Sequence, residues 1–269
     1  MSDSTKPALS SRTFTPATPL QPYRRAILVG ASSGMGAALA RRLADEGYLL
    51  ALLARRGDLL QSVCEEINRQ HAGTRAVPYE HDVADFDSVP DLLRGIISDL
   101  GGLDLFIYLT GVNVPPGLER LDFEGDRRMM EVNVLGAMAW LTPVSALFKS
   151  RHAGQIVGIS SVAGDRGRVG NPGYNTSKAA LATYLEALRN RLSRHGVHVL
   201  TVKPGFVKTD MLKAAQGGTP FAIEPERAAA DIYRAVHARK QLIYTPAIWR
   251  WIMLVIRHIP SVIFRRMTF

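Results

Sequence analysis

The sequence is poor in the residues that build disulfide scaffolds and metal sites. It holds one cysteine, Cys64, among 269 residues. One thiol cannot close an intrachain disulfide or supply the several thiolates of a zinc site. The seven histidines are scattered, and His195 and His198 show no metal-ligand spacing with carboxylates. We therefore expect no bound metal, and we expect Cys64 to be a buried core thiol.

Acidic side chains are also fewer than basic ones. The chain has 24 Asp and Glu residues and 33 Lys and Arg residues, which gives a net charge of +9. This excess favours a polyanion or a membrane surface as partner. Nucleic acid is not expected, because the basic residues are not interleaved with stacking aromatic residues. Residues 1–23 lack the apolar run of a secretory signal and are rich in Ser, Thr and Pro. They are predicted to form a flexible tail, with a transit peptide as the less favoured alternative.

Apolar residues make up 46% of the chain, and short continuous runs typical of buried strands alternate with helical periodicities. The alternation predicts an α/β fold with a doubly wound, seven-stranded parallel sheet in a single domain over residues 24–245. Strands are expected over 26–29, 49–54, 76–80, 105–109, 156–160, 197–202 and 242–244. Helices are expected over 37–45, 58–70, 88–99, 122–150, 173–194 and 226–239, the second with Asp58 as its N-cap.

A glycine-rich segment joins the first strand to the first helix. Glycine at these positions allows a tight turn, close approach of the backbone to a pyrophosphate, and close packing of helix on strand. The N-terminus of the following helix offers free N–H groups and a positive dipole end to an anion. The segment between a buried strand and a helix therefore predicts a dinucleotide-phosphate site rather than an ordinary turn. The candidate binding residues are Gly30, Ser32, Ser33, Gly34, Met35 and Gly36.

The end of the second strand indicates which dinucleotide is bound. An NAD(H) site has an acid here, which accepts a hydrogen bond from the ribose 2′-OH. This chain has Ala54, followed by Arg55 and Arg56. Guanidinium groups match a 2′-phosphate, so the sequence predicts NADP(H), unless the two arginines are only the solvated start of the next helix. Asp82 and Val83, after the third strand, are expected near the adenine ring.

Tyr174 and Lys178 are four residues apart and share one face of a predicted helix. Ser161 lies thirteen residues before Tyr174, just after a strand. A free phenol has a pKa of about 10. A neighbouring ammonium is expected to lower the pKa of the phenol, which suits proton transfer to or from a substrate. A hydroxyl beside the phenol can hold a carbonyl oxygen, so these three residues are the candidate catalytic set.

These motifs together resemble the short-chain dehydrogenase/reductase family over about residues 24–245. The matching segments are GASSGMG at 30–36, EVN ending in Asn133, ISS followed by YNTSK, and PGFVKT at 204–209. The resemblance implies a Rossmann-type fold and catalytic roles for Asn133, Ser161, Tyr174 and Lys178, with Asn133 holding a water in a proton relay. It also implies that Tyr174 and Lys178 contact the cofactor and that a further set lines the nicotinamide side. That set comprises Pro204, Gly205, Val207 and Thr209.

One motif departs from the family pattern. Where the family has Asn-Asn-Ala-Gly after the fourth strand, this chain has YLTG ending in Gly111. Gly111 retains the close approach of backbone to cofactor, but the missing amide side chains change the local hydrogen bonds. The loop 210–224 follows the cofactor-lining strand end and is expected to be mobile and to cover the substrate.

The segment 246–269 is apolar and basic, with four arginines and no acidic residue. Two arginines inside 248–264 disfavour a membrane span. Apolar residues at steps of three or four instead predict a basic amphipathic helix for an anionic membrane surface; packing on a partner subunit or over the active site is equally open. The residues of the apolar face are Trp249, Ile252, Ile256, Ile259 and Ile263.

Two further segments are the run KQLIYTPAIWRWIMLVIRHIPSVIFRR at 240–266 and SSVAGDRGR at 160–168. They are similar to the decaprenylphosphoryl 2-keto-ribose reductases of that family, which implies a keto-sugar carried on a polyprenyl phosphate as substrate. Alternatives are a 3-keto lipid such as 3-ketosphinganine, another hydrophobic ketone, or an NADP(H)-binding sensor or scaffold without turnover. We expect an NADPH-dependent reductase, cytoplasmic or peripheral on the inner membrane face. The family resemblance implies a homodimer or homotetramer.

Overall fold

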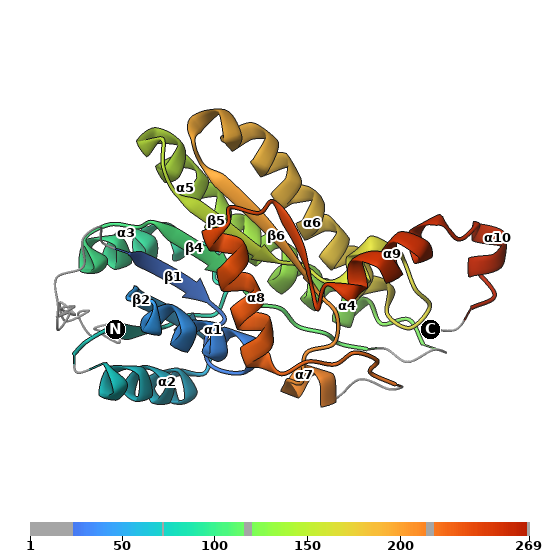
Figure 1. Ribbon diagram of the computed structural model, residues 1–269, viewed down its shortest axis with the longest axis horizontal. Helices are drawn as coiled ribbons and strands as arrows, with labels where there is room; N and C mark the ends of the chain where they lie inside the picture. The colour runs from blue at the N-terminus through green and yellow to red at the C-terminus, as the bar shows by residue number, and fades with distance from the viewer. Residues whose placement is uncertain (1–23, 72, 116–119, 214–217, 268–269) are drawn as a thin grey trace, which may run out of the picture.

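The computed structural model describes residues 24–71, 73–115, 120–213 and 218–267, so the predicted tail over residues 1–23 lies outside the described residues. The predicted fold class is confirmed: in the described residues, a sheet of seven parallel strands carries helices on both faces (Figure 1). The strands are β1 (Arg25–Val29), β2 (Leu49–Ala54), β3 (Ala76–Glu80), β4 (Leu105–Tyr108), β5 (Gln155–Ile159), β6 (His198–Pro204) and β7 (Leu242–Thr245).

The strand order is β3-β2-β1-β4-β5-β6-β7. β1 pairs with β2 on one side and with β4 on the other, so the direction in which the chain crosses the sheet reverses at β1. In open parallel sheets of this kind, the carboxyl ends of the strands at the reversal form the ligand-binding crevice. The topology therefore places the ends of β1 and β4 beside each other at the site.

Each face of the sheet is covered by three main helices. One hydrophobic cluster joins α1 (Gly34–Asp45), α2 (Gly57–Gln70) and α8 (Pro225–His237) to one face, and a second joins α3 (Val89–Leu100), α5 (Gly136–Arg151) and α6 (Pro172–Leu192) to the other. Cys64 of α2 is buried in the first cluster, as predicted. The helices are α1 (Gly34–Asp45), α2 (Gly57–Gln70), α3 (Val89–Leu100), α4 (Phe123–Met130), α5 (Gly136–Arg151), α6 (Pro172–Leu192), α7 (Asp210–Lys213), α8 (Pro225–His237), α9 (Ile248–His258) and α10 (Ser261–Phe264).

The start of α2 differs from the prediction. Asp58 was expected to be the N-cap, but the helix begins at Gly57 and its N-cap is Arg56 in extended conformation. Asp58 lies in the first turn, where its carboxylate complements the positive end of the helix dipole. The acid therefore stabilises the helix from inside the first turn rather than from the cap.

The predicted helix over 122–150 contains a change of helical pitch. α4 passes into a π-helical turn, η1 (Glu131–Leu135), before α5 continues to Arg151. The run Phe123–Arg151 is long and apolar enough to cross a membrane by length and composition alone. Trp140 and Phe148 are nevertheless fully buried against the sheet, so this run is a core element of the domain.

The C-terminal segment is not one continuous helix. α9 ends at His258, and Pro260 caps the separate short helix α10, because proline cannot donate the backbone hydrogen bond that would continue α9. Both helices lie beyond the carboxyl end of the sheet, at one end of the molecule (Figure 1).

Part of the apolar face predicted for a membrane packs on the protein itself, while Ile263 of the same face is exposed. Trp249 and Met253 of α9 are buried against Val162 in a small cluster that includes Phe206 and Tyr244. The guanidinium of the loop residue Arg166 binds the C-terminal end of α9. It donates to the carbonyls of Ile256 and Ile259, both at 2.6 Å, and lies 3.9 Å from the centre of the Phe264 ring. The periodicity correctly predicted an amphipathic helix, and the packing of Trp249 and Met253 on the domain agrees with the alternative in which the segment packs over the active site.

Two tryptophans of α9 provide a matched test of this packing. Trp249 is 5% exposed and Trp251 is 61% exposed. Trp249→Ala should lower the free energy of unfolding by about 3–5 kcal/mol, because it removes a buried aromatic ring. Trp251→Ala should change it by less than about 0.5 kcal/mol. Urea unfolding followed by circular dichroism measures both, and equal losses for the two variants would show that α9 is not docked as described.

Candidate active site

A cavity of about 450 Å³ lies at the carboxyl ends of the central strands. The residues predicted from the sequence to bind a cofactor all contribute to its wall. They are Gly30, Ser32, Ser33, Gly34, Met35, Gly36, Arg55, Arg56, Asp82, Val83, Gly111, Tyr174, Lys178, Pro204, Gly205, Val207 and Thr209. Ser161 also lines the cavity, and Asn133 is fully buried beside it. Residues far apart in the sequence thus meet around one space large enough for a ligand.

The backbone of the glycine-rich loop has the geometry that a phosphate site needs. Gly30 and Gly34 have φ angles of +103° and +52°, a region that favours glycine. A Cβ on Gly36 would lie 2.0 Å from the carbonyl oxygen of Gly30, so only glycine lets α1 start this close to β1. The first turn of α1 therefore points its free N–H groups and positive dipole end into the cavity.

The two arginines after β2 have different partners. Arg56 donates from Nη2 to the hydroxyl of Ser33 at 2.7 Å and lies 3.3 Å from the hydroxyl of Ser32, so its guanidinium is held at the phosphate loop. Arg55 instead forms an ion pair with Asp82 at 3.8 Å. Since β2 ends in Ala54, with no acid at this point, the wall fits a dinucleotide that carries a 2′-phosphate.

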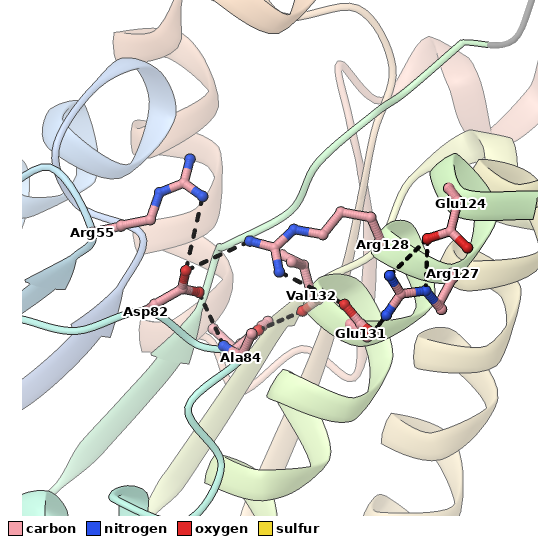
Figure 2. A network of polar contacts seen from close by, with 9 residues as sticks. Arg55, Asp82, Ala84, Glu124, Arg127, Arg128, Glu131 and Val132 are labelled. Carbon is pink, nitrogen blue, oxygen red and sulfur yellow. Dashed lines mark hydrogen bonds and ion pairs between the residues drawn. The ribbon is translucent and has the colours of Figure 1, made fainter.

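Arg128 is a cavity residue that the sequence interpretation missed. Figure 2 shows Asp82 between Arg55 and Arg128, and Arg128 lies 3.5 Å from the same carboxylate oxygen that pairs with Arg55. Arg128 also pairs with Glu131 at 3.7 Å. Arg128 lies four residues before Val132, which also lines the cavity, so both occupy one helical face. This spacing was the signal in the sequence that could have placed Arg128 on the cavity wall.

β5 and α6 bring the candidate catalytic residues together. Ser161 follows β5, and Tyr174 lies in the first turn of α6. Lys178 lies one turn later; its Nζ donates to the carbonyl of Ile159 at 3.1 Å and is 5.8 Å from the centre of the Tyr174 ring. A Cβ on Gly111 would lie 2.9 Å from this Nζ, so the glycine leaves room for the ammonium.

The electrostatics of this group differ from the sequence expectation. Burial raises the pKa of Tyr174 above its ordinary value, although the neighbouring Ser161 hydroxyl and the Arg168 guanidinium act in the opposite direction. Burial also lowers the pKa of Lys178 to about 8. The net direction for the pKa of Tyr174 in the protein alone is thus upward, opposite to the one expected from a neighbouring ammonium, because the cost of burying a phenolate dominates. At neutral pH the phenol is protonated and most of the Lys178 population is charged.

Asn133 lies in the π-helical turn and connects three parts of the site. Its Oδ1 accepts from the backbone N–H of Val112 at 2.8 Å, and its Nδ2 donates to the Val112 carbonyl at 3.0 Å. Nδ2 also donates to the Ser177 hydroxyl at 2.9 Å, which in turn donates to the Tyr174 carbonyl at 2.9 Å. Asn133 thus supplies an amide bridge after β4, close to the motif where the chain departs from the family pattern.

The segment after β6 is supported by α9, which agrees with the alternative that the C-terminal segment packs over the active site. A Cβ on Gly205 would lie 2.0 Å from Nε1 of Trp249, so the indole packs directly against this cavity residue. Met211 and Leu212, at the start of the loop predicted to cover the substrate, line the cavity. Part of that loop, 214–217, lies outside the described residues.

The arrangement is that of a dinucleotide-binding oxidoreductase, with a phosphate loop and a Ser/Tyr/Lys group on one cavity. In the described ranges, no group of three or more His, Cys, Asp or Glu side chains could hold a metal ion. The family model for short chain dehydrogenases matches residues 24–218. The chain therefore belongs to the short-chain dehydrogenase/reductase family and is an oxidoreductase of that family.

Individual relatives agree with this assignment. The chain is 39% identical over 202 residues to an uncharacterised oxidoreductase of Myxococcus xanthus, covering 75% of this chain and 79% of the relative. It is similar in fold to actinorhodin polyketide ketoreductase with NADPH, with a TM-score of 0.77, 24% identity, and 84% and 97% of the two chains covered. A short-chain dehydrogenase from Sphingobium yanoikuyae in complex with NADPH gives a TM-score of 0.77 at 23% identity, covering 88% and 97%.

We propose that Arg56 binds the 2′-phosphate of the cofactor more directly than Arg55 does. Arg56→Ala should weaken NADPH binding by about 10–100-fold, because it removes a charged hydrogen-bond donor, and leave NADH binding within about 2-fold. Arg55→Ala should cause a smaller loss, and Arg69→Ala, on the exposed surface of α2, should cause none. Titration of cofactor fluorescence measures each affinity; an unchanged preference for NADPH in Arg56→Ala would refute the assignment.

Proposed function

We propose that this protein is an NADPH-dependent reductase that converts a ketone into an alcohol. The observation that carries the proposal is the presence of Ser161, Tyr174 and Lys178 on the wall of the same cavity as the glycine-rich phosphate loop. Bound NADPH would supply a hydride to the ketone carbon. The solved proteins of similar fold that hold NADP or NADPH support this choice of cofactor.

The residues around the ketone would position its carbonyl oxygen and give it a proton. Tyr174 is protonated at neutral pH, which is the form that can donate a proton to the carbonyl oxygen. Ser161 would hold that oxygen in position, and the Lys178 ammonium would stabilise the phenolate left behind. Asn133 and Ser177 would keep the first turns of α6 in register with the loop after β4. As part of the proposal, Asn133 also holds a water that returns a proton to the site.

We infer that the ketone is carried on a lipid, with a keto-sugar on a polyprenyl phosphate as the preferred substrate. The support is the outer face of α9 and α10, which remains apolar and exposed after the inner face has docked on the domain. Its exposed apolar residues are Ile248, Trp251, Leu254, Val255, Val262 and Ile263. The four arginines of the segment, with no acidic neighbour inside it, complement an anionic membrane surface. We also propose that the protein lies peripherally on the inner membrane face and forms a homodimer or homotetramer.

The reductase activity is tested with Tyr174→Phe. With 9,10-phenanthrenequinone as a neutral dicarbonyl probe, kcat/KM should fall by about 10²–10⁴-fold, because the proton donor is lost. The affinity for NADPH should stay within about 2-fold, since the phosphate loop is unchanged. Tyr184→Phe, on the same helix with its hydroxyl 3.3 Å from Thr142, is the matched control and should retain activity. A wild-type protein that binds NADPH but reduces no carbonyl compound would favour a sensor or scaffold instead.

The membrane proposal is tested by sedimentation of the full chain with phosphatidylglycerol vesicles. The double variant Trp251→Ser, Val255→Ser should reduce the bound fraction, because it removes exposed apolar area without disturbing the buried face. Leu59→Ser, an exposed position on α2, should not. Binding that is equal in all three proteins, or equal on phosphatidylcholine and phosphatidylglycerol, would contradict the proposal.

A further inference from the structure

Arg128 reaches the cavity wall from α4, on the other side of Asp82 from Arg55 (Figure 2). Its Nη2 lies 3.5 Å from Oδ2 of Asp82, and Nη1 of Arg55 lies 3.8 Å from the same oxygen. The other oxygen of Asp82 accepts from the backbone N–H of Ala84 at 3.0 Å, which fixes the carboxylate. One fixed carboxylate thus draws two guanidinium groups, from α4 and from the end of β2, to one point on the wall.

The cavity wall carries more positive than negative charge at this point. Three arginines and one carboxylate line it after β2, after β3 and on α4, namely Arg55, Arg56, Arg128 and Asp82. Neither Arg55 nor Arg128 donates a hydrogen bond to another residue that the structure describes, so their N–H groups are open to a ligand. An anionic ligand would balance the excess of cations.

The neighbouring Arg127 shows how an arginine of α4 is held when it serves the helix itself. It binds Glu124 and Glu131, both at 2.6 Å, on the exposed surface of α4, and pairs at this spacing stabilise a helix. The ion pairs of Arg128 are longer, at 3.5 and 3.7 Å, and its side chain is 34% exposed. Partly exposed pairs of this kind contribute little to stability, so α4 does not depend on Arg128 for its structure.

We propose that Arg128 binds a phosphate group of the dinucleotide cofactor, in addition to the backbone donors of the glycine-rich loop. A guanidinium matches a phosphate with two parallel hydrogen bonds. The phosphate is either the 2′-phosphate, expected beside Arg55 and Arg56, or the pyrophosphate, expected at the start of α1. The inference rests on the proposed NADPH-dependent function. It adds a contact from α4, an element that the cofactor-binding motifs of the sequence do not include.

The test measures binding of NADPH and NADH to the full-length protein by titration of cofactor fluorescence. Arg128→Gln should weaken NADPH binding by about 10-fold, because a charged hydrogen-bond donor to a phosphate is lost. Arg128→Lys should restore part of this loss, since the ammonium keeps the charge. Raising NaCl from about 50 mM to about 500 mM should narrow the difference between the wild type and Arg128→Gln, because salt screens a partly exposed charge. Arg94→Gln, on the exposed surface of α3, is the control and should match the wild type.

The comparison of the two cofactors identifies the phosphate. A loss confined to NADPH supports a contact with the 2′-phosphate, and an equal loss for NADH supports a contact with the pyrophosphate. An NADPH affinity of Arg128→Gln within about 2-fold of the wild type would overturn the proposal. A loss that neither Arg128→Lys nor high salt reduces would also overturn it, because that result indicates stacking on the adenine ring or a disturbed α4.

Reduction of 9,10-phenanthrenequinone by the wild type is measured in parallel, so that this contact and the reductase function are tested separately. Activity on the quinone with cofactor binding that does not depend on Arg128 refutes the phosphate contact alone. Cofactor binding that depends on Arg128, without reduction of any carbonyl compound, refutes the reductase function alone.

Discussion

The buried ammonium of Lys178 is the contact on which the site depends. It joins the end of β5, through the Ile159 carbonyl, to α6, and it occupies the space that Gly111 leaves open after β4. This position fixes the rotation of α6, so Tyr174, one turn earlier, faces the cavity. The same burial lowers the pKa of Lys178 to about 8 and raises that of Tyr174. The protein thus maintains a protonated phenol next to a desolvated cation, a combination suited to donating a proton and then stabilising the phenolate.

The C-terminal helices support this site with one face and present an exposed apolar surface with the other. Trp249 packs against Gly205 on the cavity wall, and Arg166 links the end of α9 to the loop that leads to Tyr174. One face of α9 therefore stabilises the segment on which the nicotinamide would rest, while the opposite face is exposed and apolar.

Sequence reasoning succeeded where local pattern determines structure. The bounds of β2 were predicted correctly because its six residues are all apolar and all buried. The tight turn between β1 and α1 was predicted because glycine favours the positive φ angles of Gly30 and Gly34. Prediction from the sequence failed where a pKa, a packing partner or an ion pair depends on residues that are distant in the chain. The pKa of Tyr174 is set by burial that spacing does not reveal. The partner of Trp249 lies 44 residues earlier at Gly205, and Arg128 reaches Asp82 only in the folded chain.

A crystal structure of the protein with NADP⁺ bound tests the account most directly. The account predicts that the Tyr174 hydroxyl and the nicotinamide C4 face one common space, so that a ketone between them lies about 3–3.5 Å from each. It also predicts the Lys178 ammonium beside the nicotinamide ribose. A complex in which the nicotinamide lies away from the cavity wall formed by Ser161, Tyr174 and Lys178, or in which the phenol turns away from C4, would contradict the assignment of this chain as a carbonyl reductase.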